Sequence, residues 1–233
     1  RKTRRNEKKT RRALGKSAVV AIAAALTLTI AVAGGIVTLI KADVSPADKV
    51  DDTTHHAFTD DLDATTPTVD DGKGTAVSVP DMERIPGDIQ TTQRLVGKYL
   101  SKLDAEMTVE GNTIRLGTLL IDESGSGMLT YSVENPDGVK YTDAGYGEAV
   151  DMSAEPSMWL GSAPDAQGYG GTCINSRCHV DEDASTDTRL QVVLYFAAGK
   201  DFQKGDDFYF TVRDSAYQPY SISIQPQTSV PVK

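Results

Sequence analysis

The sequence predicts an all-β fold, an antiparallel sandwich preceded by one short helix, and two observations support this prediction. Between about residue 106 and residue 226, apolar and polar residues alternate in successive runs, which is the period of a half-buried strand. Turn-forming Gly, Asn and Pro residues separate these runs. Six to eight short strands in about 125 residues favour a single sandwich, because that length supplies one core and is too short for two.

The N-terminal part of the chain has a different character. Residues 1–17 form a basic segment, in which nine Lys and Arg residues face one acid, Glu7, for a local charge of +8. Residues 18–40 then contain no charge over 23 positions. At about 1.5 Å per residue, a helix of that length crosses the roughly 30 Å hydrocarbon core of a bilayer. The sequence therefore predicts a transmembrane helix over residues 18–40.

Charge sets the expected orientation of this helix. Cationic flanks stay on the cytoplasmic side, so the basic segment is expected inside the cell and everything after residue 40 outside it. Anionic lipid headgroups are the expected partner of the basic segment. A cleaved signal peptide is the alternative, because Ala31 and Ala33 occupy the −3 and −1 positions of a small-residue cleavage site.

The rest of the chain is strongly acidic. It carries 15 basic and 32 acidic residues, a net charge of −17, which disfavours nucleic-acid binding because that binding depends on neutralising phosphates. Residues 41–85 are rich in Asp, Thr and Pro and are predicted to form a disordered stalk, with His55 and His56 as solvated linker residues. Residues 86–233 are predicted to form the extracytoplasmic β-sandwich with its N-terminal helix.

The helix is predicted between Pro86 and Leu103, with Asp88 or Thr91 as its N-cap. Its apolar residues recur with a period of 3.6 and are Val96, Tyr99, Leu100 and Leu103. A hairpin turn is predicted at Gly111-Asn112, and a type I turn at residues 135–138. The expected core positions of the later strands are Leu129, Tyr131, Val133, Leu190, Val192, Leu194, Phe196, Phe208, Phe210, Val212, Tyr220, Ile222 and Ile224.

Cys173 and Cys178 are the only cysteines of the sequence, and His179 follows them directly. Outside the cytoplasm a disulfide is favoured, and this pair would close a small hairpin loop. A structural zinc would need a fourth ligand, and a redox motif would need two intervening residues rather than four. Free thiols in a reducing environment remain the other alternative.

No catalytic or metal-binding motif is complete in the sequence. Asp181, Asp183 and Asp187 resemble the first half of a calcium loop, but Val192 stands where the closing glutamate is required. Ser126 lies between adjacent glycines and predicts a turn rather than a nucleophile elbow. No enzyme activity, cofactor or metal is therefore expected.

A candidate ligand surface is predicted in the glycine-rich stretch between residues 141 and 171. Tyr146 and Tyr169 alternate there with glycines, a composition used in recognition loops. Trp159 lies in the same stretch and completes the candidate surface.

The order of basic segment, apolar span, acidic stalk and a β-domain beginning VEGNTIRLGTLLIDESGSGMLTYSVENPDG resembles the membrane-anchored extracytoplasmic proteins of Gram-positive bacteria. These include the immunoglobulin-like sensor portions of anti-sigma-factor-type proteins. The resemblance implies an immunoglobulin-like sandwich and a single-pass surface protein that binds or senses an extracytoplasmic ligand or protein. The alternative is a transmembrane regulator that holds a cytoplasmic partner, which an additional helical domain upstream of Arg1 would favour.

Overall fold

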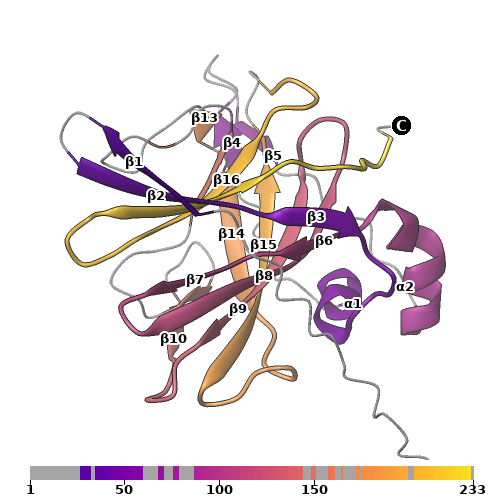
Figure 1. The fold of residues 1–233 in the computed structure, drawn as a ribbon. Coiled ribbons are helices and arrows are strands. Elements are labelled where there is room, and N and C mark those ends of the chain that lie inside the picture. The colour runs from indigo at the N-terminus through magenta and orange to yellow at the C-terminus, as the bar shows by residue number, and fades with distance from the viewer. Residues whose placement is uncertain are drawn as a thin grey trace, which may run out of the picture.

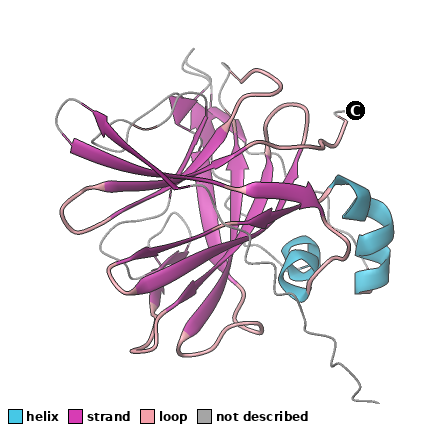
Figure 2. Cartoon of the chain, in the orientation of Figure 1, coloured by secondary structure: helices cyan, strands magenta, loops and turns pink. Residues whose placement is uncertain are grey.

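The chain folds as two β-sheets, with two helices against the outer face of one of them (Figure 1). The computed structural model describes residues 27–32, 35–59, 68–70, 76–78, 87–143, 148–150, 157–160, 164, 172–173, 175–198 and 202–231. Most of the described chain is strand (Figure 2).

The helices are α1 (Asp52–Thr59), α2 (Ile89–Val96) and the 3₁₀ turn η1 (Gly97–Tyr99). The strands of the N-terminal half are β1 (Thr27–Val32), β2 (Gly35–Lys41), β3 (Asp43–Pro46), β4 (Thr68–Asp70), β5 (Ala76–Ser78), β6 (Ser101–Asp104), β7 (Glu106–Val109) and β8 (Asn112–Ile121). The remaining strands are β9 (Gly127–Glu134), β10 (Tyr141–Asp143), β11 (Glu148–Val150), β12 (Ser157–Leu160), β13 (Thr172–Cys173), β14 (Asn175–Val180), β15 (Arg189–Ala197), β16 (Phe208–Arg213) and β17 (Pro219–Ile224).

Two sheets hold most of these strands. The first sheet has the order β1-β2-β17-β16-β12-β13, and the second has the order β14-β15-β9-β8-β6-β3, with β7 also paired to β8. Neighbours run antiparallel except β2 and β17, which are parallel where residues 38–41 face residues 220–223. β4 pairs with β5, and β10 with β11, as separate two-stranded units. The predicted all-β sandwich is thus confirmed.

The main core fills the space between the two sheets. Alternate residues of β9 point into it, and Tyr131 there is 1% exposed. Every core position that the period-two pattern predicts lies in this core, except Tyr220, which is partly buried against it. The pattern succeeded because each strand of an antiparallel sandwich presents one face to the opposite sheet.

Both predicted turns are present, and one of them is shifted by a residue. Val109 pairs with Asn112, so the two-residue turn is Glu110-Gly111 rather than Gly111-Asn112. Both turn residues have positive φ, 49° and 83°, as the twist of a two-residue hairpin requires. At the second turn, Gly138 N donates to Asn135 O over 3.0 Å.

The helices form a third layer with its own small core. Leu120, Met128, Val193 and Tyr195 come from the outer face of the second sheet, and Val50, Ala57, Phe58 and Leu100 cover them. The predicted N-cap of α2 is confirmed, because Asp88 Oδ1 accepts Thr91 N over 3.0 Å. The prediction for the end of the helix was wrong, since β6 begins at Ser101 and places Leu103 in the main core.

The apolar N-terminal segment differs from its prediction. Residues 27–32 and 35–41, which overlap the predicted transmembrane helix 18–40, form an antiparallel hairpin, and Ile40 is 7% exposed in the main core. Among the described residues, no helix is long and apolar enough to cross a membrane. The physical reason is that a charge-free run suits a buried strand as well as a bilayer, and the β-branched Ile36, Val37 and Ile40 favour the strand. Residues 18–26 lie outside the described residues.

The first part of the predicted disordered stalk is folded. β3 pairs with β6, and α1 packs on the second sheet with Phe58 4% exposed. The folded unit therefore includes residues 35–59 and does not begin at residue 86 as predicted. The high Asp content misled the prediction, because Asp51 acts as a helix cap and a few apolar residues are enough to dock a short helix.

Candidate functional site

The predicted ligand surface is only partly described. Tyr146 and Tyr169 lie outside the described residues. Trp159 lies in the backbone of β12, opposite Tyr209 of β16 and Cys173 of β13. Nothing in the described structure brings these three aromatic residues together, so this surface stays a prediction.

The two cysteines lie in different sheets. Cys173 belongs to β13 in the first sheet, and Cys178 lies in β14 of the second sheet, opposite Leu194. They therefore do not lie on the two arms of one hairpin. Cys178 Sγ lies 3.5 Å from the hydroxyl of Tyr131, at the edge of the main core. The side chain of Cys173 is outside the described residues, so the disulfide stays a prediction.

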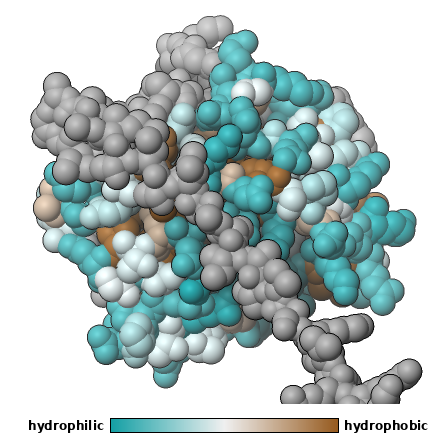
Figure 3. Space-filling view, in the orientation of Figure 1, coloured by the Kyte–Doolittle hydropathy of each residue, from teal (hydrophilic) through white to brown (hydrophobic). Residues whose placement is uncertain are grey.

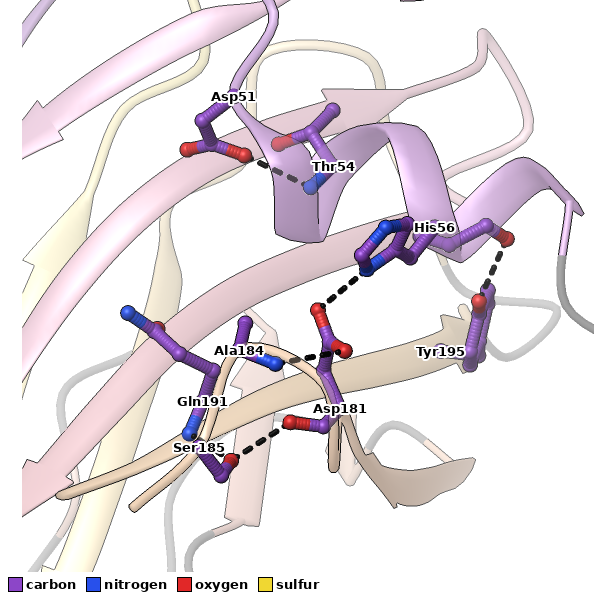
Figure 4. Close-up of polar contacts among 9 residues, drawn as sticks. Asp51, Thr54, His56, Asp181, Ala184, Ser185, Gln191 and Tyr195 are labelled. Carbon is purple, nitrogen blue, oxygen red and sulfur yellow. Dashed lines mark hydrogen bonds and ion pairs between the residues drawn. The ribbon is translucent and has the colours of Figure 1, made fainter.

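The acidic loop after β14 is tied to the helical layer. Asp181, only 3% exposed, accepts a hydrogen bond from His56 Nδ1 of α1 over 2.9 Å (Figure 4). Its other carboxylate oxygen faces Ala184 N at 3.3 Å. Ser185 Oγ donates to Asp181 O over 2.6 Å and accepts Gln191 N over 2.9 Å. Through these contacts the loop holds α1 in place, and the carboxylate of Asp181 is taken up by hydrogen bonds within the protein.

α1 is fixed at both ends by polar contacts. At its start, Asp51 Oδ1 accepts Thr54 N over 2.7 Å. Near its end, the Tyr195 hydroxyl donates to Ala57 O over 2.6 Å (Figure 4). His55 Nδ1 lies 2.8 Å from Thr92 Oγ1 of α2. The two histidines predicted to be solvated linker residues therefore join α1 to its neighbours.

A ladder of threonine hydroxyls lies beneath α1. Thr54 Oγ1 is 2.6 Å from Thr118 Oγ1 of β8, which is 3.0 Å from Thr130 Oγ1 of β9. Thr130 Oγ1 also accepts Thr118 N over 2.8 Å, at an irregularity where the β8–β9 register shifts between Leu116 and Leu119. All three threonines are buried. The hydroxyls replace the interrupted ladder and leave the sheet surface polar beside the helix.

Next to this ladder a groove of about 410 Å³ opens between the start of α1 and the outer face of the second sheet. We call it the α1 groove and define it by its polar lining, Asp51, Asp52, Arg115, Ser132, Arg189 and Gln191. Its volume is within the range of roughly 300–1,000 Å³ typical of small-molecule sites. The described face drawn in Figure 3 otherwise shows separate apolar patches among hydrophilic residues.

Ion pairs hold the two arginines of the groove. Arg115 Nε donates to Glu106 Oε2 over 2.8 Å, and its Nη1 donates to Glu134. Arg189 Nε lies 3.2 Å from Glu134 Oε1. The hydrogen bond with Glu134 raises the pKa of Arg115, with a smaller contribution from Glu106. Glu134 thus bridges both guanidinium groups and sets their position at one wall of the groove.

The His56–Asp181 contact resembles half of a catalytic triad, because Asp orients a histidine through Nδ1. A triad also needs a hydroxyl or thiol available to the other ring nitrogen. Ser185, the serine of this network, is already committed to Asp181 O and Gln191 N. Among the described residues, no group of three or more His, Cys, Asp and Glu is arranged to hold a metal ion.

Comparison of the chain with models of protein families, with curated proteins and with solved structures found no match. The α1 groove was not anticipated from the sequence. Thr130, Ser132 and Glu134 alternate with apolar residues on β9 and mark only its outward face, so the sequence pattern carries no signal that α1 lies over it.

Proposed function

We propose that this protein is a single-pass bacterial surface protein whose extracytoplasmic β-sandwich binds or senses a small ligand without catalysis. The observation that carries the proposal is the α1 groove, a concave polar site between two layers of the fold. Its walls come from a helix start and from three strands of one sheet, so its shape is set by secondary structure rather than by loops.

An immunoglobulin-like topology supports the assignment to surface recognition. The run β14-β15-β9-β8 in the second sheet corresponds to the D-E-B-A order of immunoglobulin domains. The run β17-β16-β12 in the first sheet corresponds to the order G-F-C. Together with β2 lying parallel to the last strand, these strand orders support the proposal of an immunoglobulin-like sandwich, to which the helices add a further layer.

The proposed membrane attachment is shorter than the 23-residue span expected from the sequence. Because β2 belongs to the folded unit, only residues 18–34 remain for the bilayer, 17 residues that meet the lower limit of about 17–25 for a helix. β1 lies at the edge of its sheet and pairs with β2, so its departure breaks the hydrogen bonds of one strand pair. Cleavage after Ala33 would likewise leave β2 intact.

The orientation and the attachment are tested together in intact cells. Protease added to intact cells should digest the β-sandwich, because the sandwich is expected outside the membrane. The basic segment 1–17 should stay protected. N-terminal sequencing of the mature protein separates an anchored form from one that begins at Gly34. Recovery of the whole chain from the cytosol would contradict the proposal.

Ligand binding is tested with the full chain purified in detergent micelles. Equilibrium dialysis against a mixture of small metabolites, read by mass spectrometry, should enrich at least one compound. The double variant Arg189→Gln/Asp52→Asn should lose that enrichment, and the matched double variant Arg94→Gln/Asp104→Asn, which alters exposed residues outside the groove, should keep it. Enrichment that survives the groove variant would contradict the assignment of the site.

A further inference from the structure

Charged groups of both signs line the α1 groove, and Glu134 pairs with its two arginines. Asp51 and Asp52 supply two negative charges from the start of α1, and Arg115 and Arg189 supply two positive charges from the facing strands. The carboxylates come from the start of α1, and the guanidinium groups come from β8 and β15. A ligand that contacts both sets carries separated charges of opposite sign.

The hydrogen-bonding capacity of each charged set is only partly used. A guanidinium has five N–H donors. Among the described residues, the Arg189 side chain contacts Glu134 through its Nε. Asp51 accepts Thr54 N with one carboxylate oxygen, while Asp52 is exposed at the first position of the helix. Arg189 and Asp52 are therefore the two charged groups best able to face a ligand.

The floor between these charged sets is hydrophilic. Ser132 and Gln191 line it from β9 and β15. Tyr131 is the one aromatic residue among the described lining residues, and its ring is buried in the main core against Phe210, 5.1 Å away. A sugar or a flat apolar ligand would find no ring to stack on among the described lining residues, and a ligand with a single charge would use only one of the two charged sets.

From this arrangement we propose that the α1 groove binds a free α-amino acid, with Arg189 on its carboxylate and Asp52 on its ammonium group. The inference rests on the proposed function, because it names the ligand class of the same groove. The floor residues Ser132 and Gln191 add hydrogen bonds to whichever side chain the amino acid carries. The ion pairs of Arg115 and Arg189 with Glu134 hold the two guanidinium groups in place before the carboxylate of the ligand binds.

The test is calorimetric titration of the full chain with each of the twenty common L-amino acids. For every amino acid that binds, two analogues follow: the 2-hydroxy acid, which keeps the carboxylate and lacks the ammonium, and the amino acid amide, which keeps the ammonium and lacks the carboxylate. We expect at least one amino acid to bind, and both of its analogues to bind at least about tenfold more weakly.

Two single variants assign the charged sets. Arg189→Gln should lower the affinity for the amino acid by at least about tenfold, to that for its amide, because the carboxylate then loses its cationic partner Arg189. Asp52→Asn should lower the affinity for the amino acid to the affinity for its 2-hydroxy acid, because the ammonium group then loses its anionic partner. The exposed pair Arg94→Gln and Asp104→Asn, outside the groove, should change nothing, and it controls for the loss of one charge of each sign.

Three outcomes would overturn the inference. The first is that no amino acid binds, and the second is that an analogue binds as tightly as the parent amino acid. The third is that binding is unchanged in both groove variants. If a different compound is retained in dialysis and lost in the Arg189→Gln/Asp52→Asn variant, the ligand class is wrong while the proposed function stands. If nothing is retained, both fail.

Discussion

The rings of Tyr131 and Phe210 lie 5.1 Å apart and are inclined by 59°, and they join β9 of one sheet to β16 of the other. Both residues are 1% exposed or less, at the centre of the main core. In the proposed immunoglobulin-like topology, β9 and β16 take the places of the two strands that a disulfide joins in antibody domains. Here an aromatic pair provides the contact between the sheets, at tilted geometry that rings favour.

Truncating this pair should destabilise the whole sandwich. Phe210→Ala is expected to lower the free energy of unfolding by about 3–5 kcal/mol, since it leaves a cavity between the sheets. Phe202→Ala is the control, because Phe202 is only partly buried at the edge of the same core and should cost less. Urea unfolding monitored by circular dichroism measures both. Equal losses would show that the sheets do not depend on the central contact.

Asp181→Ala should weaken the attachment of α1. The change removes the acceptor of His56 Nδ1 and of Ala184 N, and an unsatisfied buried group costs about 1–3 kcal/mol. The exposed neighbour Asp183→Ala should stay within about 0.5 kcal/mol of the parent protein. Hydrogen exchange of the amides of α1 should rise in the first variant only. Unchanged exchange would mean that the loop does not hold the helix.

Thr118→Val tests the hydroxyl ladder beneath α1. Valine has nearly the same shape, but it leaves the hydroxyls of Thr54 and Thr130 without their shared partner, at a cost of about 1–2 kcal/mol. Thr108→Val is the matched control, since Thr108 has an exposed hydroxyl 3.4 Å from that of Thr113. Thermal unfolding compares the two. A control that loses as much as Thr118→Val would argue against a special role of the buried ladder.

Cys173→Ser reports on the predicted disulfide. Because the two cysteines belong to different sheets, a bridge between them would connect the sheets over a loop of four residues. The chain-entropy contribution of so short a loop is about 2 kcal/mol. The variant should therefore unfold at a lower denaturant concentration under oxidising conditions and behave like the parent protein under reducing ones. The same loss in both conditions would exclude the bridge.

Stability should fall at high pH through Tyr209. Burial raises the pKa of its phenol above 10.0, with a further contribution from the negative charge of Asp207. The folded state therefore favours the protonated phenol, so this stabilisation is complete below pH 10 and is lost as the pH rises through the folded-state pKa. Tyr209→Phe should unfold with a weaker pH dependence above pH 10 than the parent protein. An identical pH profile would contradict this assignment.

The strand pattern was predictable because it depends on local alternation. Leu129, Tyr131 and Val133 identify their strand and its inward face without knowledge of the partner. The same logic failed for residues 35–41, because a continuous apolar run has no period and only the presence of β17 decides its structure. Composition failed for α1 in the same way, since its polar residues bond to groups far along the chain, such as His56 to Asp181.

The α1 groove was beyond local patterns for a related reason. Asp52 and Arg189 are separated by more than a hundred residues in the sequence, and each alone is an ordinary surface charge. Only the docking of α1 on the second sheet brings both of them to the lining of one cavity. Tyr146, Tyr169 and Trp159 were predicted from the composition of the stretch around them, and composition does not indicate which residues lie close together in the fold.

The parallel pairing of β2 with β17 has a mechanical consequence. A force applied to the chain before Gly35 acts on the sandwich through β2. The hydrogen bonds between residues 38–41 and residues 220–223 lie across the direction of that force. They resist it together, in shear, rather than opening one after another like a zipper. A sandwich pulled through this strand would therefore keep its shape until these hydrogen bonds break together.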